Sequence, residues 1–359
     1  MELDRREVLR LGLGLLLGGA SWGWSNGAEA QDKKGKKGEP APDEAGKGKK
    51  GKPAPEPLKS QVLEIERDKK GTTLTLQLEQ APFPFPGKPW KDSTVLVYVP
   101  HHHRIGNNKG DKVHVVVHFH GHNTTAAQSM EDHQLREQFA ESLQNAILVM
   151  PQGPVRAGTG HPGKLGEQDG LVRFLTDLRE TLQGSKADKA LGKAGLGPKT
   201  RVGMVCLSAH SGGYRTALDC VEFGGFEVQE LWLFDSLYSE GRRLVDWVAA
   251  GKPDGKQWTH KLISYYTGGA VQGQNKSLMR GLEAAGLEVL HEEKEGTLTR
   301  AQLTTGRAIF IRTRSGHGNV THTYNGLRDC LYASALPRNA KSDWFKDKNK
   351  PRELDERGE

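Results

Sequence analysis

The sequence is poor in cysteine, in hydrophobic residues and in long apolar runs. Only three cysteines occur among its 359 residues, Cys206, Cys220 and Cys330. So small and odd a number argues against a scaffold that depends on disulfide bonds. The apolar run from Leu11 to Trp22 is shorter than the about 20 residues that span a membrane. The sequence therefore does not predict a stable membrane span.

Hydrophobic residues make up only 35% of the chain, and part of this deficit lies at its two ends. Residues 31–57 contain no aromatic residue and no aliphatic residue larger than alanine. Such a segment cannot bury enough apolar surface to offset the entropy lost on ordering, so we expect a flexible linker. The charged tail, residues 338–359, is also expected to be flexible. Residues 58–337 remain as one folded domain, which is large enough to bury a sizeable core.

The chain carries a formal net charge of +7 and has a pI near 9.1. A basic balance of this kind would permit binding to nucleic acid or to an anionic surface. However, eight lysines lie between Lys33 and Lys52, within the predicted linker. Because the folded domain contributes much less to the excess, we expect no nucleic-acid partner.

The first 30 residues have the features of an export signal. Arg5 and Arg6 precede the apolar run, and Ala28-Glu29-Ala30 supplies the small residues of a cleavage site. Adjacent arginines before a weakly hydrophobic core resemble a twin-arginine signal. The resemblance implies that the twin-arginine export machinery is a partner, and that the folded protein works in the periplasm or outside the cell. A retained N-terminal anchor is the alternative.

Two hydrophobic patterns follow one another in the folded domain. Alternating apolar and polar residues predict antiparallel strands at residues 62–66, 72–79 and 94–99. Short apolar runs then predict buried parallel strands at residues 113–119, 146–150, 202–207, 231–234, 262–266 and 308–311. Helix-compatible segments lie among them at residues 125–143, 171–182, 214–221 and 277–285. This alternation predicts an α/β fold with a mostly parallel central sheet, helices on both faces and antiparallel strands at the N-terminal edge.

The strand predicted at residues 202–207 leads into Ala209-His210-Ser211-Gly212-Gly213 and then into a helix. A serine between small neighbours at a strand-to-helix turn is typical of a nucleophile elbow, although alanine stands where the pattern usually has its first glycine. A His-Gly loop comes earlier in the chain, and an acid and a histidine come later, in the order that such sites use. In these features, over roughly residues 94–336, the chain resembles the α/β-hydrolase superfamily, and in particular its secreted serine esterases and depolymerases.

The resemblance implies an oxyanion hole beside Ser211. The strand predicted at residues 113–119 runs into His120-Gly121, which corresponds to the oxyanion loop of the family. The backbone N–H groups of His122 and Gly212 would then hold the negative charge that develops on the substrate oxygen. His118, His120 and His122 alternate, however, so a zinc site on these histidines is an alternative.

Candidates for the acid and the base follow two later strands. Asp235 comes directly after the strand predicted at residues 231–234, whereas no carboxylate follows the next strand until Glu283. His317 lies in the loop after the last strand, where the family keeps its histidine, and His322 is the competing candidate for the base. We expect Asp235 to accept the ring N–H of the histidine and to stabilise its charged form.

Together these residues predict an exported serine hydrolase that cleaves an ester or related acyl bond with Ser211, Asp235 and His317, and without a cofactor. Its substrate would be a small-molecule or polymeric acyl compound whose identity the sequence does not fix. Two alternatives stay open. One is a non-catalytic cell-envelope binding protein on the same fold, and the other is a zinc-dependent hydrolase built on His118, His120 and His122.

Overall fold

The computed structural model of the protein describes residues 58–107, 111–158, 160–255, 257–339 and 342–358. The export signal predicted for residues 1–30 and the linker predicted for residues 31–57 lie outside the described residues. Among the residues that are described, no helix is both long enough and apolar enough to cross a membrane.

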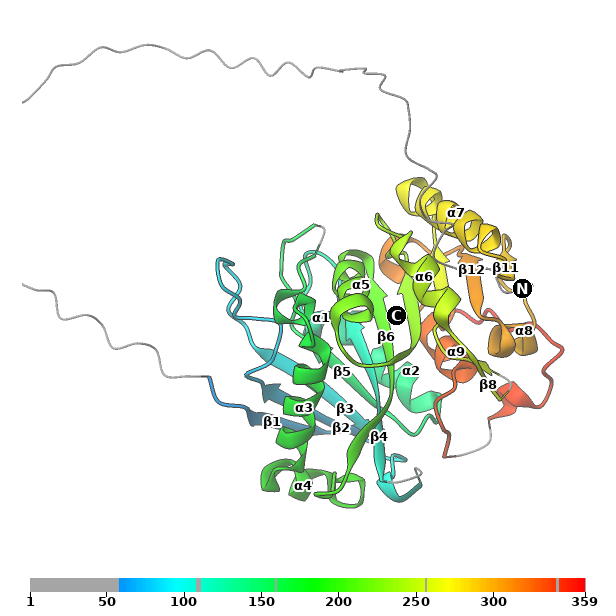
Figure 1. The fold of residues 1–359 in the computed structure, drawn as a ribbon. Helices are drawn as coiled ribbons and strands as arrows, with labels where there is room; N and C mark the ends of the chain where they lie inside the picture. The colour runs from blue at the N-terminus through cyan, green and yellow to red at the C-terminus, as the bar shows by residue number, and fades with distance from the viewer. Residues whose placement is uncertain (1–57, 108–110, 159, 256, 340–341, 359) are drawn as a thin grey trace, which may run out of the picture. The chain divides into compact units, whose positions relative to one another are not determined.

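A ten-stranded sheet forms the centre of the fold, with the strand order β1-β2-β3-β5-β4-β6-β7-β10-β12-β11 (Figure 1). Its strands are β1 (Gln61–Arg67), β2 (Gly71–Gln77), β3 (Thr94–Pro100), β4 (Lys112–Phe119), β5 (Ile147–Pro151), β6 (Arg201–His210), β7 (Val228–Phe234), β10 (Lys261–Tyr266), β11 (Val289–Glu292) and β12 (Ala308–Arg312). The first three pair antiparallel, and β3 is antiparallel to β5. From β5 to β11 every neighbouring pair is parallel. The carboxyl ends of these parallel strands therefore meet at one edge of the sheet.

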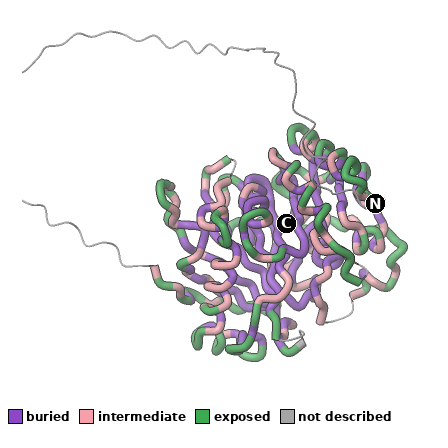
Figure 2. The backbone as a smooth tube through the Cα atoms, viewed as in Figure 1, coloured by how far each residue is buried: buried purple, intermediate pink, exposed green. Residues whose placement is uncertain are grey.

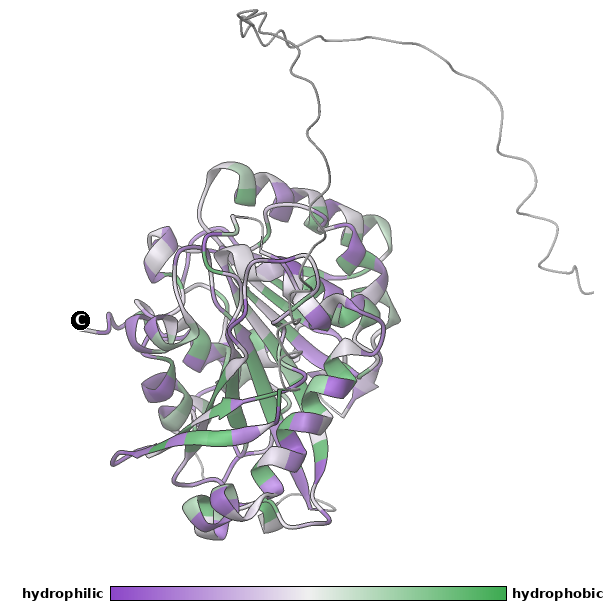
Figure 3. Ribbon diagram, turned by 90° about the vertical axis from the view of Figure 1, so that its left-hand side faces the viewer, coloured by the Kyte–Doolittle hydropathy of each residue, from purple (hydrophilic) through white to green (hydrophobic). Residues whose placement is uncertain are grey.

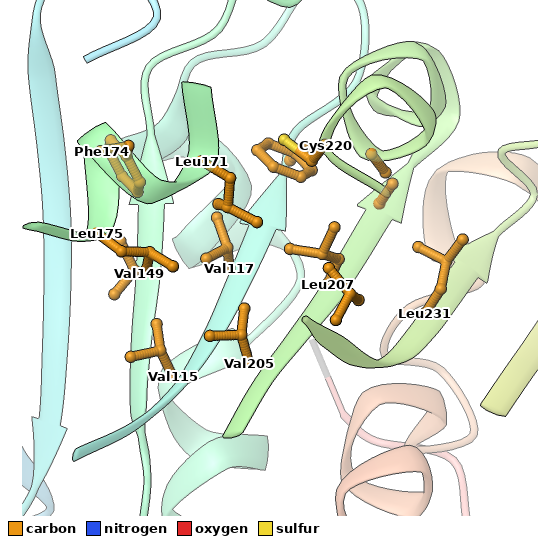
Figure 4. Close-up of a cluster of buried hydrophobic side chains, with 14 of the residues drawn as sticks. Val115, Val117, Val149, Leu171, Phe174, Leu175, Val205, Leu207, Cys220 and Leu231 are labelled. Atoms are coloured by element: carbon orange, nitrogen blue, oxygen red, sulfur yellow. The ribbon is translucent and has the colours of Figure 1, made fainter. Parts of the chain in front are cut away.

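The parallel strands are hydrophobic because both of their faces are covered. Side chains alternate between the two sides of a strand, so Val115 and Val117 of β4 enter one core while Val116 enters the other. Figure 4 shows the first of these cores, with Val117 near Leu207 of β6 and Leu171 of a covering helix. In Figure 3 the central strands of the sheet are accordingly coloured mostly as hydrophobic.

Helices complete a layer on each side of the sheet. The helices that contribute to the core of Val115 are α3 (Gly170–Gln183), α4 (Ser185–Leu191), α5 (Tyr214–Phe223), α6 (Arg243–Ala250) and α7 (Gly269–Ala284). Those that contribute to the core of Val116 are α1 (Ala126–Asp132), α2 (Leu135–Glu141), α8 (Arg300–Thr305) and α9 (Gly326–Ala333). Figure 2 shows the result, buried strands in the interior and exposed residues on the outer surfaces of the helices.

The predicted fold class is confirmed: an α/β fold with a mostly parallel sheet, helices on both faces and antiparallel strands at the N-terminal edge. All predicted strands are present, but two helices differ from their predicted bounds. The helix predicted at residues 125–143 is broken into α1 and α2, because Gln134 adopts a left-handed conformation with φ of 47°. The helix predicted at residues 277–285 starts earlier, at Gly269, where the glycines of its first turns had obscured it.

The C-terminal segment differs most from the sequence prediction. A flexible tail is predicted there, but its described residues pack against the domain. The side chain of Arg352 is fully buried, and its guanidinium reaches three carboxylates. Its Nη2 lies 2.8 Å from Glu295 Oε1 and 3.5 Å from Glu292 Oε2, and its Nη1 lies 3.2 Å from Asp329 Oδ2. Nearby, the ring of Trp344 stacks on Tyr332 of α9. At least one charged side chain of this tail, that of Arg352, is thus buried in the fold.

We predict that Arg352→Ala lowers the free energy of unfolding by about 3–5 kcal/mol, because it leaves buried carboxylates without their cation. Urea unfolding followed by circular dichroism measures the change. The control is Lys350→Ala, whose ion pair with Asp347 is exposed and should contribute less than about 1 kcal/mol. Equal effects of the two substitutions would contradict the packing of the tail.

Candidate active site

The nucleophile candidate stands at a sharp turn between β6 and α5. The strand ends at His210, and Ser211 follows with φ of 51°, a left-handed conformation that is rare for any residue with a side chain. The chain can bend so tightly because the two residues that follow Ser211 are glycines. A Cβ on Gly213 would lie 2.5 Å from the carbonyl oxygen of Phe119, and one on Gly212 would lie 3.3 Å from that of Gly158. The turn therefore requires glycine at position 213, and it turns Ser211 towards the ends of the neighbouring strands.

Ser211, His317 and Asp235 form one hydrogen-bonded chain. The Oγ of Ser211 lies 2.9 Å from Nε2 of His317, and Nδ1 of the same ring lies 2.6 Å from Oδ2 of Asp235. An ionised carboxylate can only accept, so Nδ1 carries the hydrogen and Nε2 is left to accept the serine proton. The structure thus brings the three predicted residues together from three separate strand ends.

Asp235 is held in place by a residue that the sequence reasoning missed. It follows β7 with φ of 46°, and its Oδ1 accepts the backbone N–H of Thr267 at 2.7 Å and the Thr267 hydroxyl at 2.9 Å. Burial raises the pKa of this carboxyl, but the hydrogen bonds from His317 and Thr267 outweigh burial and hold the pKa below its usual value. The strand end at Thr267 offers no acid of its own and instead fixes the orientation of Asp235.

The structure places His317, and not His322, between the serine and the aspartate. His322 lies farther along the same segment, where its ring stacks on His133 with centroids 5.8 Å apart. The segment that carries both is held by the C-terminal tail. At its start, Glu295, the partner of Arg352, also accepts the backbone N–H of Arg314 at 2.7 Å. Beyond His322, the carbonyl oxygen of Thr323 accepts the backbone N–H of Arg357 at 2.9 Å.

The proposed oxyanion loop lies directly against the turn at Ser211. A Cβ on Gly121 would come within 2.9 Å of the Cβ of Ser211, so only glycine allows this approach. His120 is buried and fixes the loop: its Nδ1–H donates to the carbonyl oxygen of Gly121, and its Nε2 accepts the backbone N–H of Gly153 at 2.8 Å. His122 follows with an exposed side chain. This arrangement is compatible with backbone donors at His122 and Gly212.

The zinc alternative finds no ligand set in the described part of the chain. No three His, Cys, Asp or Glu side chains there are arranged so that they could hold a metal ion. His118 is buried at the end of β4, with Nδ1 2.8 Å from the hydroxyl oxygen of Ser208, and both nitrogens of His120 are used by the loop. The zinc site predicted on His118, His120 and His122 is therefore not formed, because His118 and His120 make separate hydrogen bonds.

A second residue that the sequence reasoning missed is His210. Its side chain is only 6% exposed, and its Nε2–H donates to the carbonyl oxygen of His317 at 2.9 Å. The ring also packs edge-on against His133, with centroids 4.6 Å apart. Burial lowers the pKa of His210 to about 4 and that of His133 to about 2, so both rings are neutral at neutral pH. His210 thus ties the loop of the candidate base to the turn of the candidate nucleophile.

We predict that these buried histidines make the fold sensitive to acid. Between about pH 6.5 and the lowered pKa of His133, only the unfolded chain binds a proton at this ring, so lowering the pH favours unfolding. His133→Asn removes the ring, and the fall in unfolding free energy between pH 6.5 and 4.5 should become shallower by about 1.4 kcal/mol per pH unit. Urea titrations at several pH values measure this slope, and an unchanged slope would contradict a buried neutral His133.

Comparisons with known proteins return distant structural similarities. No model of a protein family matches the chain, and no curated protein matches it either. An S-formylglutathione hydrolase from Agrobacterium tumefaciens is similar at 12% identity with a TM-score of 0.43, covering 77% of this chain and 100% of its own. A feruloyl esterase module from Clostridium thermocellum is similar at 12% identity and a TM-score of 0.43, covering 79% and 89%. Because these TM-scores are low, the description of the fold and the candidate site depends on the strand order and hydrogen bonds of this chain itself.

Proposed function

We propose that this protein is a serine hydrolase that cleaves carboxylic esters, with Ser211 as nucleophile, His317 as general base and Asp235 as its partner. One observation carries the proposal: the unbroken hydrogen-bonded chain from Ser211 through His317 to Asp235, at a turn that forces the serine into a left-handed conformation. Strained backbone and a nucleophile beside an oriented base are features of covalent catalysis.

The reaction would begin when Nε2 of His317 takes the proton from Ser211 as Oγ bonds to the acyl carbon. The negative charge that then forms on the carbonyl oxygen would be held by the backbone N–H groups of His122 and Gly212, each contributing about 3 kcal/mol to transition-state stabilisation. His317 would next protonate the departing alcohol oxygen, leaving an acyl-enzyme. Water, deprotonated by the same ring, would release the carboxylic acid and restore Ser211.

Asp235 would have two tasks in this cycle. Its lowered pKa keeps it ionised at neutral pH, so it opposes the positive charge that His317 gains in each proton transfer. Its hydrogen bond to Nδ1 also holds the ring in the tautomer that leaves Nε2 free to accept. Thr267 supports both tasks, because its two donors prevent the carboxylate from rotating away.

We predict that Ser211→Ala lowers kcat for 4-nitrophenyl acetate by several orders of magnitude, on the order of 10⁶ where a nucleophile is lost completely, and abolishes labelling by a fluorophosphonate. Ser277→Ala is the control, because Ser277 is exposed on α7. Wild-type protein that is folded but neither labelled nor active would favour the non-catalytic binding protein. Labelling that persists in Ser211→Ala would exclude Ser211 as the nucleophile.

We further propose that the protein is exported through the twin-arginine machinery and works in the periplasm or outside the cell, on the basis of Arg5, Arg6 and Ala28-Glu29-Ala30. Replacing both arginines with lysine should hold the protein in the cytoplasm, as measured by fractionation and fluorophosphonate labelling of each fraction. Equal export of the substituted and unsubstituted chains would contradict this route.

A further inference from the structure

Ser211 and His317 are among the residues that line a wide groove with a cavity volume of about 830 Å³. This volume is within the range of about 300–1,000 Å³ that is usual for small-molecule sites. The groove is also lined by Gly318 and Asn319, which follow His317, and by the tail residues Glu356 and Arg357. A group that departs from the acyl carbon must receive its proton from His317. Because His317 lines the groove, the groove can receive the leaving alcohol.

The described residues that line this groove include no aliphatic side chain and no phenylalanine, tyrosine or tryptophan. Most ligand sites are lined mainly by hydrophobic and aromatic side chains. Here fifteen residues line the groove, of which five are histidines, four carry a formal charge, five are serine, threonine, asparagine or glutamine and one is glycine. An alkyl chain or an aryl ring placed against these groups would remove water from them without offering hydrogen bonds in return, which costs free energy.

The charges of the groove disfavour an anionic ligand. Three carboxylates line it, against a single guanidinium, that of Arg357. Glu131 is paired with Arg136, and one oxygen of Glu356 accepts the Tyr324 hydroxyl at 3.1 Å, so Asp132 and the other oxygen of Glu356 carry the negative charge of the groove. The guanidinium of Arg357 is already paired, since its Nη1 lies 2.7 Å from a carboxylate oxygen of Glu141. The rings of His133 and His210 are neutral at neutral pH because burial lowers their pKa values. A neutral ligand rich in hydroxyl groups meets these conditions, because hydroxyls donate to carboxylates and exchange hydrogen bonds with imidazole and amide groups.

We propose that this groove binds the alcohol part of the ester, and that this alcohol is a neutral carbohydrate. The inference rests on the proposed serine hydrolase function and assigns its substrate class: esters whose acyl group is carried on a sugar hydroxyl. Asp132, at the end of α1, and Glu356, in the C-terminal tail, are both exposed and accept hydrogen bonds from the sugar hydroxyls. Neither residue belongs to the hydrogen-bonded chain of Ser211, His317 and Asp235.

The test compares two acetates of primary alcohols of similar size, methyl 6-O-acetyl-glucoside and hexyl acetate. The acyl group is the same in both, so a difference in kcat/KM reports on the groove. We expect the wild-type protein to prefer the sugar acetate by about tenfold or more, the ratio given by one or two hydrogen bonds to charged groups. Asp132→Ala and Glu356→Ala should each reduce this preference several-fold, by lowering kcat/KM for the sugar acetate.

The control is Glu283→Ala, which removes an exposed carboxylate on α7 that is not part of the groove and should keep the wild-type preference. Thermal unfolding verifies that each variant is folded. A preference for hexyl acetate, or an unchanged preference in both Asp132→Ala and Glu356→Ala, would overturn the carbohydrate assignment while leaving the serine mechanism intact. Protein that cleaves neither acetate and resists the fluorophosphonate would overturn the proposed function itself.

Discussion

The tight turn at Ser211 is the constraint on which the rest of the site depends. With φ of 51°, the serine occupies a conformation that costs free energy, and only close packing around it can hold it there. Glycines permit this packing, since a Cβ on Gly213 would collide with the carbonyl oxygen of Phe119 and a Cβ on Gly121 would collide with the Cβ of Ser211. Because β4 and β6 are neighbours in the sheet, the loop after β4 is carried to the serine by strand order alone.

Two further loops complete the site, and each is held by contacts between distant segments. Asp235 depends on Thr267 at the end of the next strand, whose backbone and hydroxyl both donate to it. His317 lies in a more exposed loop, which is tied to the turn through His210 and to the C-terminal tail through Glu295 and the backbone of Arg357. The tail is therefore a support for the candidate base as well as a wall of the groove.

The strands and the residues of the candidate triad could be predicted because their signals are local. Apolar runs report burial on both faces, and a serine between small residues reports a tight turn. The alanine at position 209 did not obscure the pattern. What could not be predicted depends on contacts between separated segments. Nothing near Arg352 in the sequence indicates that residues 292, 295 and 329 converge on it. A charged tail is therefore predicted to be exposed to solvent. His210 and Thr267 gain their roles only when strands β6, β7, β10 and β12 are aligned.

In the proposed reaction, Ser211 bonds to the acyl carbon while two backbone donors hold the substrate oxygen. A crystal structure of the protein after reaction with a fluorophosphonate tests it most directly, because the phosphonyl group imitates the tetrahedral intermediate. We expect phosphorus on Oγ of Ser211, with its oxygen about 2.7–3.1 Å from the N–H nitrogens of both His122 and Gly212. Phosphorus on another side chain, or an oxygen that points away from both donors, would contradict the proposed reaction.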